Sequence, residues 1–276
     1  MADRIRIGII GVGQIGKHHV AEYRQIPEAQ IVAVADVRED EAARVAAENN
    51  IPSYYTDYQQ LLARDDIDAV DVCLHNRLHA PVTLEALQAG KNVYCEKPLS
   101  WTYPDARAMV ETAQRLGLKL HMQLSTIYSP EARAAKRLID DGQLGEIYYV
   151  KSCHYRRRGR PYVDGYATPP FVQKGAAGGG ALIDIGVYHI GRMLWLLGNR
   201  APLTVSGFTC QKLDNMYPAR REHSCFDVEE LGVAFIRLAG GLADVHRPFL
   251  PPPSIALSLD WLDRKLGKPI PLEEVL

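Results

Sequence analysis

The chain has 276 residues, 47% of them apolar, which is enough for two modest domains or one large one. Its 32 basic and 33 acidic side chains leave a net charge of −1, so no overall field favours nucleic acid or an anionic membrane. We find no signal-peptide pattern at the N-terminus and no apolar run long enough to span a bilayer. The composition therefore predicts a cytoplasmic protein that acts on small molecules.

The first patterned segment covers residues 5–36. An apolar run over 5–10 predicts a strand, and it is followed by Gly11-Val12-Gly13-Gln14-Ile15-Gly16, a helical pattern and a second apolar run over 31–35. In a G-x-G-x-x-G loop the first glycine permits a tight turn, the second lets the backbone approach a pyrophosphate, and the third lets the helix pack closely on the strand. The amides at the start of the helix can then hold phosphates. The segment predicts a dinucleotide-binding site.

Asp36 bears on the choice of cofactor. It follows Gly16 by twenty residues, where a carboxylate can accept hydrogen bonds from an adenosine ribose and would repel a 2′-phosphate. Arg38 could instead meet a 2′-phosphate. We favour NAD over NADP and place Asp36, Val37 and Arg38 in the predicted cofactor site.

Helical and strand patterns alternate after Asp36, which predicts a doubly wound parallel sheet with helices on both faces. Ligands of such sheets bind beyond the carboxyl ends of the strands. The residues that end or follow the predicted strands are therefore candidates, among them Leu74, residues 75–79 and residues 96–98. The predicted helices cover 39–49, 58–63, 81–89 and 104–116, and the predicted strands cover 69–74, 92–95 and 118–124.

The pattern changes at about residue 125, so we predict a Rossmann domain over 1–124 and an α+β domain over 125–276. A basic loop follows the β-rich run, and a glycine cluster precedes the second helix. The second domain has predicted helices over 130–140, 181–197 and 254–266, and strand-like runs over 147–154, 204–210, 231–238 and 241–245.

Two clusters could carry chemistry. Lys97 follows a strand of the nucleotide domain, where a lysine near the nicotinamide could accept or donate a proton; the alternative is a solvated lysine paired with Glu96. Asp184 and Tyr188 are four residues apart, so both project from one face of a regular helix, with His189 turned roughly 100° away from Tyr188. They could hold a polyol and pass a proton, or Asp184 could simply satisfy a buried tyrosine hydroxyl. No histidine spacing indicates a metal site.

These segments together resemble the glucose-fructose oxidoreductase, inositol dehydrogenase and MocA (Gfo/Idh/MocA) family. The resemblance rests on the glycine loop, the Asp36 strand end, and residues 76–79, 90–98 and 178–188, and it extends from about 5 to 238. It implies a Rossmann domain, then an α+β domain with an open, largely antiparallel sheet. It also implies NAD(P)-dependent oxidation of sugars or cyclitols, and a homo-oligomer, dimer or tetramer, formed through that sheet. By this resemblance Lys97 is the catalytic lysine and Asp184 a substrate-site residue, while Asn76, His79 and Glu96 line the cofactor pocket.

Three positions depart from the family pattern. Tyr188 stands where many members have histidine, which makes Tyr188 the first candidate for a proton relay and His189 the second. Ile127 stands where relatives often have arginine, and Pro251-Pro252-Pro253 follows the strand at 241–245 closely, which predicts a shortened sheet.

We therefore predict an NAD-dependent oxidoreductase that acts on a secondary alcohol or carbonyl of a sugar, cyclitol or related polyol, with Lys97 and Tyr188 as proton relay. Two alternatives stay open: an NAD-dependent glycosidase that uses transient oxidation, and a non-catalytic sensor of dinucleotide or sugar. The predicted catalytic set is Lys97, Tyr188, Asp184 and His189. The predicted cofactor-binding set is Gly11, Gly13, Gln14, Ile15, Gly16, Asp36, Val37, Arg38, Leu74, Asn76, His79, Glu96 and Lys97.

Overall fold

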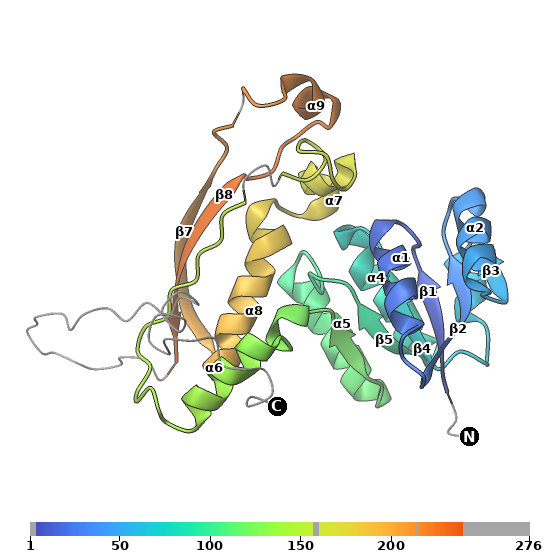
Figure 1. Cartoon of the computed structure of the whole chain (residues 1–276), viewed down its shortest axis with the longest axis horizontal. Helices are drawn as coiled ribbons and strands as arrows, with labels where there is room; N and C mark the ends of the chain where they lie inside the picture. The colour runs from blue at the N-terminus through green and yellow to red at the C-terminus, as the bar shows by residue number, and fades with distance from the viewer. Residues whose placement is uncertain (1–3, 157–159, 214, 240–276) are drawn as a thin grey trace, which may run out of the picture. The chain divides into compact units, whose positions relative to one another are not determined.

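The computed structural model describes residues 4–156, 160–213 and 215–239 (Figure 1). By their contacts, the residues divide into two compact units. Among the described residues, the first unit comprises 4–123, 160–184 and 215–228, and the second unit comprises 124–156, 185–213 and 229–239. Each unit is described by itself below. None of the helices in the described ranges is both long and apolar enough to cross a membrane.

The first unit contains a six-stranded parallel sheet in the order β3-β2-β1-β4-β5-β6. Because β1, β4 and β5 are paired in parallel, with Ile10 beside Val72 and Val72 beside Cys95, their carboxyl ends meet at one edge. The predicted Rossmann fold is confirmed. The strands are β1 (Ile5–Ile10), β2 (Ala29–Ala35), β3 (Ser53–Tyr55), β4 (Ala69–Val72), β5 (Asn92–Cys95) and β6 (Leu120–Met122).

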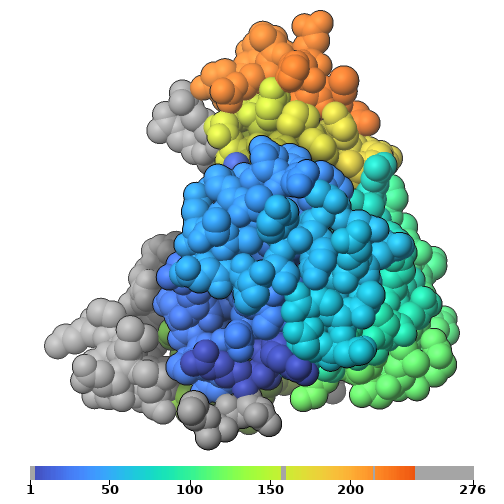
Figure 2. Space-filling view, turned by 90° about the vertical axis from the view of Figure 1, so that its right-hand side faces the viewer, coloured from blue at the N-terminus to red at the C-terminus, as the bar shows by residue number. Residues whose placement is uncertain are grey.

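Five helices cover the two faces of this sheet. They are α1 (Gln14–Tyr23), α2 (Glu39–Asn49), α3 (Tyr58–Leu62), α4 (Asn76–Gln88) and α5 (Tyr103–Leu116). Alternate strand residues point to opposite faces, so Ile9 and Val34 pack with α1 and α2, while Ile10 and Ala33 pack with α3, α4 and α5. Figure 2 views the β3 edge, where residues of α2 and β3 form a continuous surface.

Short helices complete the first unit. The segment from residue 160 includes η2 (Pro169–Val172) and α7 (Lys174–Ala177), and α9 (Pro218–His223) lies between the two strands of the second unit along the chain. A π-helical turn, η3 (Leu182–Gly186), precedes α8 (Val187–Leu196). Gly178 has φ +83°, and a Cβ there would lie 2.5 Å from Trp101 Cβ, so glycine permits the close approach of this turn.

The second unit combines helices with an antiparallel pair of strands. The turn η1 (Ser125–Ile127), α6 (Pro130–Asp140) and α8 pack against one another. β7 (Pro202–Cys210) and β8 (Leu231–Leu238) pair over nearly their whole lengths. In Figure 1 they form a twisted two-stranded ribbon. The predicted α+β character and antiparallel sheet are confirmed, and within the described ranges this sheet has two strands.

Several predicted elements differ from the observed ones. Residues 147–154 form no strand: they pair with none of the strands in the described part of the chain, and strand-forming residues become a strand only when they pair. The sequence predicts that a helix starts at Pro81, but α4 begins at Asn76 and contains Pro81. The side chains of Asn76 and His79 fix its first turn through hydrogen bonds with the backbone oxygens of Ala177 and Pro98. β6 is shorter than predicted, and the expected helix over 181–197 begins with the π-helical turn.

Some predictions lie outside the described residues. These are the strand over 241–245, the three prolines 251–253, the helix over 254–266, and residues 157–159 of the basic loop.

Two glycines of the loop after β1 give a matched test of packing. A Cβ at Gly16 would lie 2.0 Å from the backbone oxygen of Gly11, whereas a Cβ at Gly13 would meet no atom within 4 Å. We expect Gly16→Ala to lower the free energy of unfolding by about 1–3 kcal/mol, because backbone must move. Gly13→Ala should change it by less than about 0.5 kcal/mol. Urea unfolding of both variants checks this, and equal stabilities would contradict the packing argument.

Candidate active site

The glycine loop packs closely against the protein at Gly11 and borders open space at Gly13. Gly11 has φ +91°, and a Cβ there would lie 2.4 Å from the backbone oxygen of Cys73. Gly13 faces open space and is the N-cap of α1, where it offers no side-chain acceptor to the first-turn amides. Gln14 and Ile15 follow on the exposed side of the first turn. The loop thus leaves room at Gly13, beside the N-terminus of α1, where the pyrophosphate of a dinucleotide can approach the backbone.

Asp36 is held by two backbone amides, one of which belongs to this loop. Its Oδ2 accepts from Val12 N at 3.0 Å and its Oδ1 accepts from Arg38 N at 3.0 Å. The Arg38 guanidinium approaches Oδ1 at 3.4 Å but is largely exposed, and Val37 is almost fully exposed. The carboxylate is therefore fixed beside the glycine loop, while its arginine neighbour keeps contact with solvent.

Lys97 is held by Asp184. Its Nζ donates to Asp184 Oδ1 and to the backbone oxygen of Asp184, both at 2.7 Å, and both side chains are mostly buried. The carbonyl belongs to the π-helical turn, and such turns break the regular hydrogen-bond ladder of a helix. The sequence alternative of a solvated lysine paired with Glu96 is therefore wrong: the ammonium pairs with Asp184, 87 residues further on.

The backbone around Lys97 is fixed by other contacts. Glu96 Oε2 accepts from Lys97 N at 2.9 Å, and the Lys97–Pro98 peptide bond is cis. His79 is fully buried, with Nδ1 2.6 Å from the oxygen of Pro98 and Nε2 2.9 Å from the oxygen of Leu74. Burial lowers the pKa of His79, and a neutral ring has one N–H, so one of these two carbonyls receives a hydrogen bond at a time. His79 thereby links the ends of β4 and β5.

A buried polar cluster lies behind Glu96. His19 Nδ1 is 2.8 Å from Asp71 Oδ2, and its Nε2 is 3.1 Å from Glu96 Oε1, an ion pair that lacks the alignment of a hydrogen bond. Burial lowers the pKa of His19, but the hydrogen bond with Asp71 and the charge of Glu96 outweigh it and raise the pKa to about 10. Burial raises the pKa of the nearby Cys73 thiol. An imidazolium between two carboxylates is thus built into the first unit.

Part of this cluster has the composition of a metal site. The ligand atoms of His19, Asp71 and Cys73 all lie within 4.8 Å of one another. The histidine nitrogen that faces the other two groups is, however, already in a hydrogen bond with Asp71. The geometry is explained by hydrogen bonding and charge pairing, and we assign no metal to it.

The two other predicted catalytic residues, Tyr188 and His189, lie on α8 in the second unit. His189 Nδ1 is 2.6 Å from Ser152 Oγ, and its ring is 5.1 Å from that of His154. Burial lowers the pKa of His189, and Arg192 and His154 lower it further, so the ring is neutral at neutral pH. The prediction that Asp184 and Tyr188 share one helical face assumed a regular α-helix, and the π-helical turn removes that premise.

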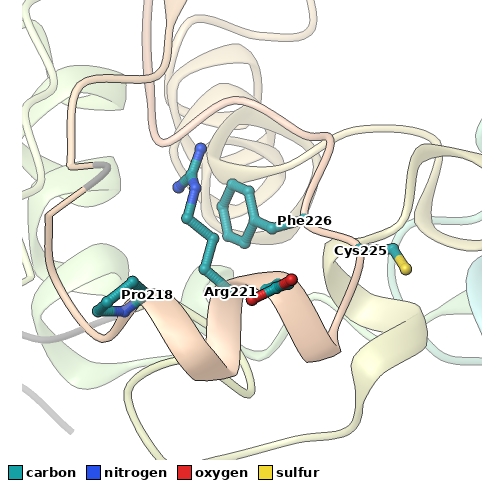
Figure 3. A pocket seen from close by; sticks show the side chains of 5 residues that line it. Pro218, Arg221, Cys225 and Phe226 are labelled. Carbon is teal, nitrogen blue, oxygen red and sulfur yellow. The ribbon is translucent and has the colours of Figure 1, made fainter.

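A separate hollow of about 400 Å³ lies beside α9 (Figure 3). The figure shows the Arg221 side chain beside the Phe226 ring, and the guanidinium carbon is 4.5 Å from the ring centroid. Pro218, Glu222 and Cys225 complete the lining. None of the predicted site residues lines this hollow.

Comparison with known proteins shows the family to which the chain belongs. Residues 5–124 match the model of an oxidoreductase family with an NAD-binding Rossmann fold, and residues 132–246 match the GFO/IDH/MocA C-terminal domain. The chain belongs to the Gfo/Idh/MocA oxidoreductase family. The predicted resemblance is confirmed, and the N-terminal part is an NAD-binding Rossmann domain of this family.

Individual relatives of this Gfo/Idh/MocA protein act on sugars and cyclitols. D-glucoside 3-dehydrogenase of Escherichia coli is 35% identical over 76% of this chain and 58% of its own length. Inositol 2-dehydrogenase of Pseudomonas savastanoi is 31% identical over 71% of this chain and 55% of its own. The structure of levoglucosan dehydrogenase with NADH is 25% identical, with a TM-score of 0.71 over 87% of this chain and 65% of that one. The chain thus spans little more than half the length of these curated relatives.

The buried cluster shows what the sequence reasoning missed. Neither residue belongs to a recognisable motif: the histidines lack metal-ligand spacing, and Asp71 lies inside an apolar strand pattern. A signal was nevertheless present: a carboxylate in a fully buried strand position needs a partner, and a histidine three residues after Gly16 is close enough to supply one. Asn76, His79 and Glu96, predicted to line the cofactor pocket, bond to Ala177, to Pro98 and Leu74, and to Lys97 N. Their contact with the cofactor stays a prediction.

The raised pKa of His19 predicts how stability depends on pH. Folding keeps the proton on His19 up to about pH 10, whereas the unfolded chain releases it near 6.5. The stabilisation is therefore complete below about pH 6.5 and is lost as the pH rises through about 10, with a slope of at most about 1.4 kcal/mol per pH unit. His19→Gln should be less stable at neutral pH and should lose this part of the slope.

Urea unfolding across that pH range measures the effect. His18→Gln is the control, because His18 is the exposed neighbour of His19 on α1. It should keep the slope of the wild type. Parallel pH profiles for wild type and His19→Gln would contradict a buried imidazolium.

Proposed function

We propose that this protein is an NAD-dependent oxidoreductase of a sugar, cyclitol or related polyol, in which Lys97 and Tyr188 transfer the proton of the reacting hydroxyl. The observation that carries the proposal is the pairing of Lys97 with Asp184 in the unit that holds the glycine loop. The activities printed for the matched dehydrogenases support the same reaction class. Residues 1–124 would bind the cofactor, and residues 125–276 would supply most of the substrate contacts.

The residues of the first unit fit a dinucleotide. Amides at the start of α1, from Gly13 to Gly16, would hold the pyrophosphate, and Gly13 leaves space for it. Asp36 would accept hydrogen bonds from the adenosine ribose, and its negative charge favours NAD over NADP. Val37, Arg38 and Leu74 border this path along the carboxyl edge of the sheet. When bound, NAD supplies the hydride acceptor.

Lys97 is suited to take part in proton transfer. As a neutral amine Lys97 Nζ can accept the proton of a substrate hydroxyl, and as an ammonium it donates to Asp184. Asp184 fixes the amine in place and compensates its charge when it is protonated. Because Lys97 is mostly buried, a proton that it takes from the substrate stays near the site until a relay carries it away.

Tyr188 would provide that relay, with His189 second. A phenol can donate and accept in one chain of hydrogen bonds. The hydrogen bond between His189 and Ser152 supports a relay that continues along the second unit. The family pattern, in which the fourth residue after the aspartate is histidine or tyrosine, supports a role for Tyr188.

We also propose that the protein forms a homo-oligomer through the β7–β8 sheet. Ser206 pairs with Phe235 and Phe208 pairs with Val233, which places the two phenylalanines diagonally on one face. Both rings are well exposed in the described structure. Exposed aromatic side chains that lie together on one face of a sheet are typical of an interface.

Lys97→Ala tests the catalytic assignment. We expect turnover to fall at least about 100-fold, because the proton acceptor is lost, while the affinity for NADH changes little. Nicotinamide absorbance against a panel of sugars, inositols and dihydrodiols measures turnover, and NADH fluorescence measures binding. The control is Lys119→Ala, an exposed lysine before β6.

Unchanged turnover in Lys97→Ala would refute the role of this lysine. Release of free sugar without net NADH would instead indicate a glycosidase with transient oxidation. Tight NADH binding without turnover of any substrate by the wild type would indicate a sensor.

Asp36→Ala tests the cofactor preference. We expect the dissociation constant for NADH to rise about 10- to 100-fold, since a charge-assisted hydrogen bond is lost. The affinity for NADPH should fall less, because a repulsive charge is removed together with the acceptor. Asp40→Ala, at the exposed first turn of α2, is the control. Equal losses for both cofactors would refute the ribose contact.

A further inference from the structure

Glu96 is a buried carboxylate whose two oxygens contact different residues. Oε2 accepts from Lys97 N at 2.9 Å, and Oε1 lies 3.1 Å from His19 Nε2. Its side chain is 8% exposed. Such a group stays ionised only if nearby charges and donors replace the water it has lost. His19 supplies the positive charge, and Lys97 supplies the amide.

His19 is held from its other side as well. Its Nδ1 pairs with Asp71, whose side chain is fully buried on β4. The remaining groups around the ring are neutral: Cys73 Sγ is 3.3 Å from Nδ1, the Tyr94 ring is tilted by 47° at 5.9 Å between ring centroids, and the Tyr23 hydroxyl is in a hydrogen bond with Asp71. His18, the exposed neighbour on α1, lies 6.3 Å away between ring centroids. The ring therefore has a carboxylate on each side and no other anion among these neighbours.

We propose that His19 is a positioning residue for Lys97 and acts through Glu96; this inference rests on the proposed function. His19 lies on the helix that follows the glycine loop, so it joins the predicted phosphate-binding helix to the turn that carries the lysine. The contact of its ring with Oε1 keeps the Glu96 carboxylate directed at Lys97 N. Asp184 fixes the amine of the same residue. The Glu96 carboxylate then fixes the backbone of Lys97, and the Asp184 carboxylate fixes its side chain.

Replacement of His19 should loosen the turn that carries Lys97, although no group that reacts with the substrate is removed. Without its contact with His19, the Glu96 carboxylate would turn more freely, and its hydrogen bond to Lys97 N would weaken. A displacement of about 1 Å at a reacting group costs up to about 100-fold in rate. The effect should fall on kcat more than on KM, because His19 touches neither substrate nor the sugar-binding residues that we propose.

A double-mutant cycle tests the pathway. We expect His19→Gln and Glu96→Gln each to lower kcat about 10- to 100-fold, with KM for the sugar changed less than about threefold. The double variant should be no slower than the slower single variant, since both act on one contact. Glu96→Gln conserves size and keeps an acceptor for Lys97 N, so it serves if His19→Gln folds poorly. His18→Gln is the matched control and should match the wild type.

A second measurement does not depend on turnover. Acetic anhydride acetylates a lysine only through its neutral amine, and peptide mass spectrometry can follow Lys97 as a function of pH in the protein without cofactor. We expect the pH profile of Lys97 labelling to shift in His19→Gln and Glu96→Gln, and to stay unchanged in His18→Gln. Thermal unfolding of each variant confirms that the folded protein is being labelled.

These results separate the two proposals. An unshifted labelling profile in folded His19→Gln, or multiplicative losses of kcat in the double variant, would overturn the positioning role. A shifted profile in a protein whose wild type turns over no substrate would support the positioning role and refute the proposed function.

Discussion

The parallel pairing of β1, β4 and β5 is the constraint on which the site depends. Because Ile10, Val72 and Cys95 lie side by side in register, the residues that follow them must leave the sheet at the same edge. Gly11, Cys73 and Glu96 are thereby brought together from segments far apart in the sequence. Gly11 must be glycine because the backbone of Cys73 leaves no room for a Cβ. The shape of the loop is thus set by the neighbouring strand as much as by its own sequence.

Charge balance explains why so many polar groups can be buried at this edge. Three carboxylates, those of Asp71, Glu96 and Asp184, are largely removed from water, and each is within ion-pair distance of His19 or Lys97. A buried carboxylate without such a partner would take up a proton instead of keeping its charge. Removal of the His19 charge therefore affects both Asp71 and Glu96. This is why His19, which carries no predicted contact with substrate, can still influence Lys97.

The parts of this arrangement that depend on local sequence could be predicted, and those that depend on distant segments could not. The roles of Gly11 and Gly16 follow from the spacing of a short loop, and the bounds of α2, α6, β5 and β8 follow from their patterns. The contact between Lys97 and Asp184 crosses 87 residues and was approached only through family resemblance. Residues 147–154 have strand-forming side chains, but strand formation needs a partner elsewhere in the chain. The π-helical turn was missed because its sequence also suits an α-helix.

The division of the chain into units differs from its division along the sequence, and this matters for the chemistry. Residues 160–184 and 214–228 lie within the region matched by the C-terminal domain model, yet they pack in the unit of the Rossmann sheet. Asp184 therefore reaches Lys97 within one compact unit, and this pairing does not require the second unit to adopt one particular orientation. Tyr188, four residues later, lies in the other unit. The amine that we propose as proton acceptor and the tyrosine that we propose as relay are therefore held by different units, and only the amine has its carboxylate partner within its own unit.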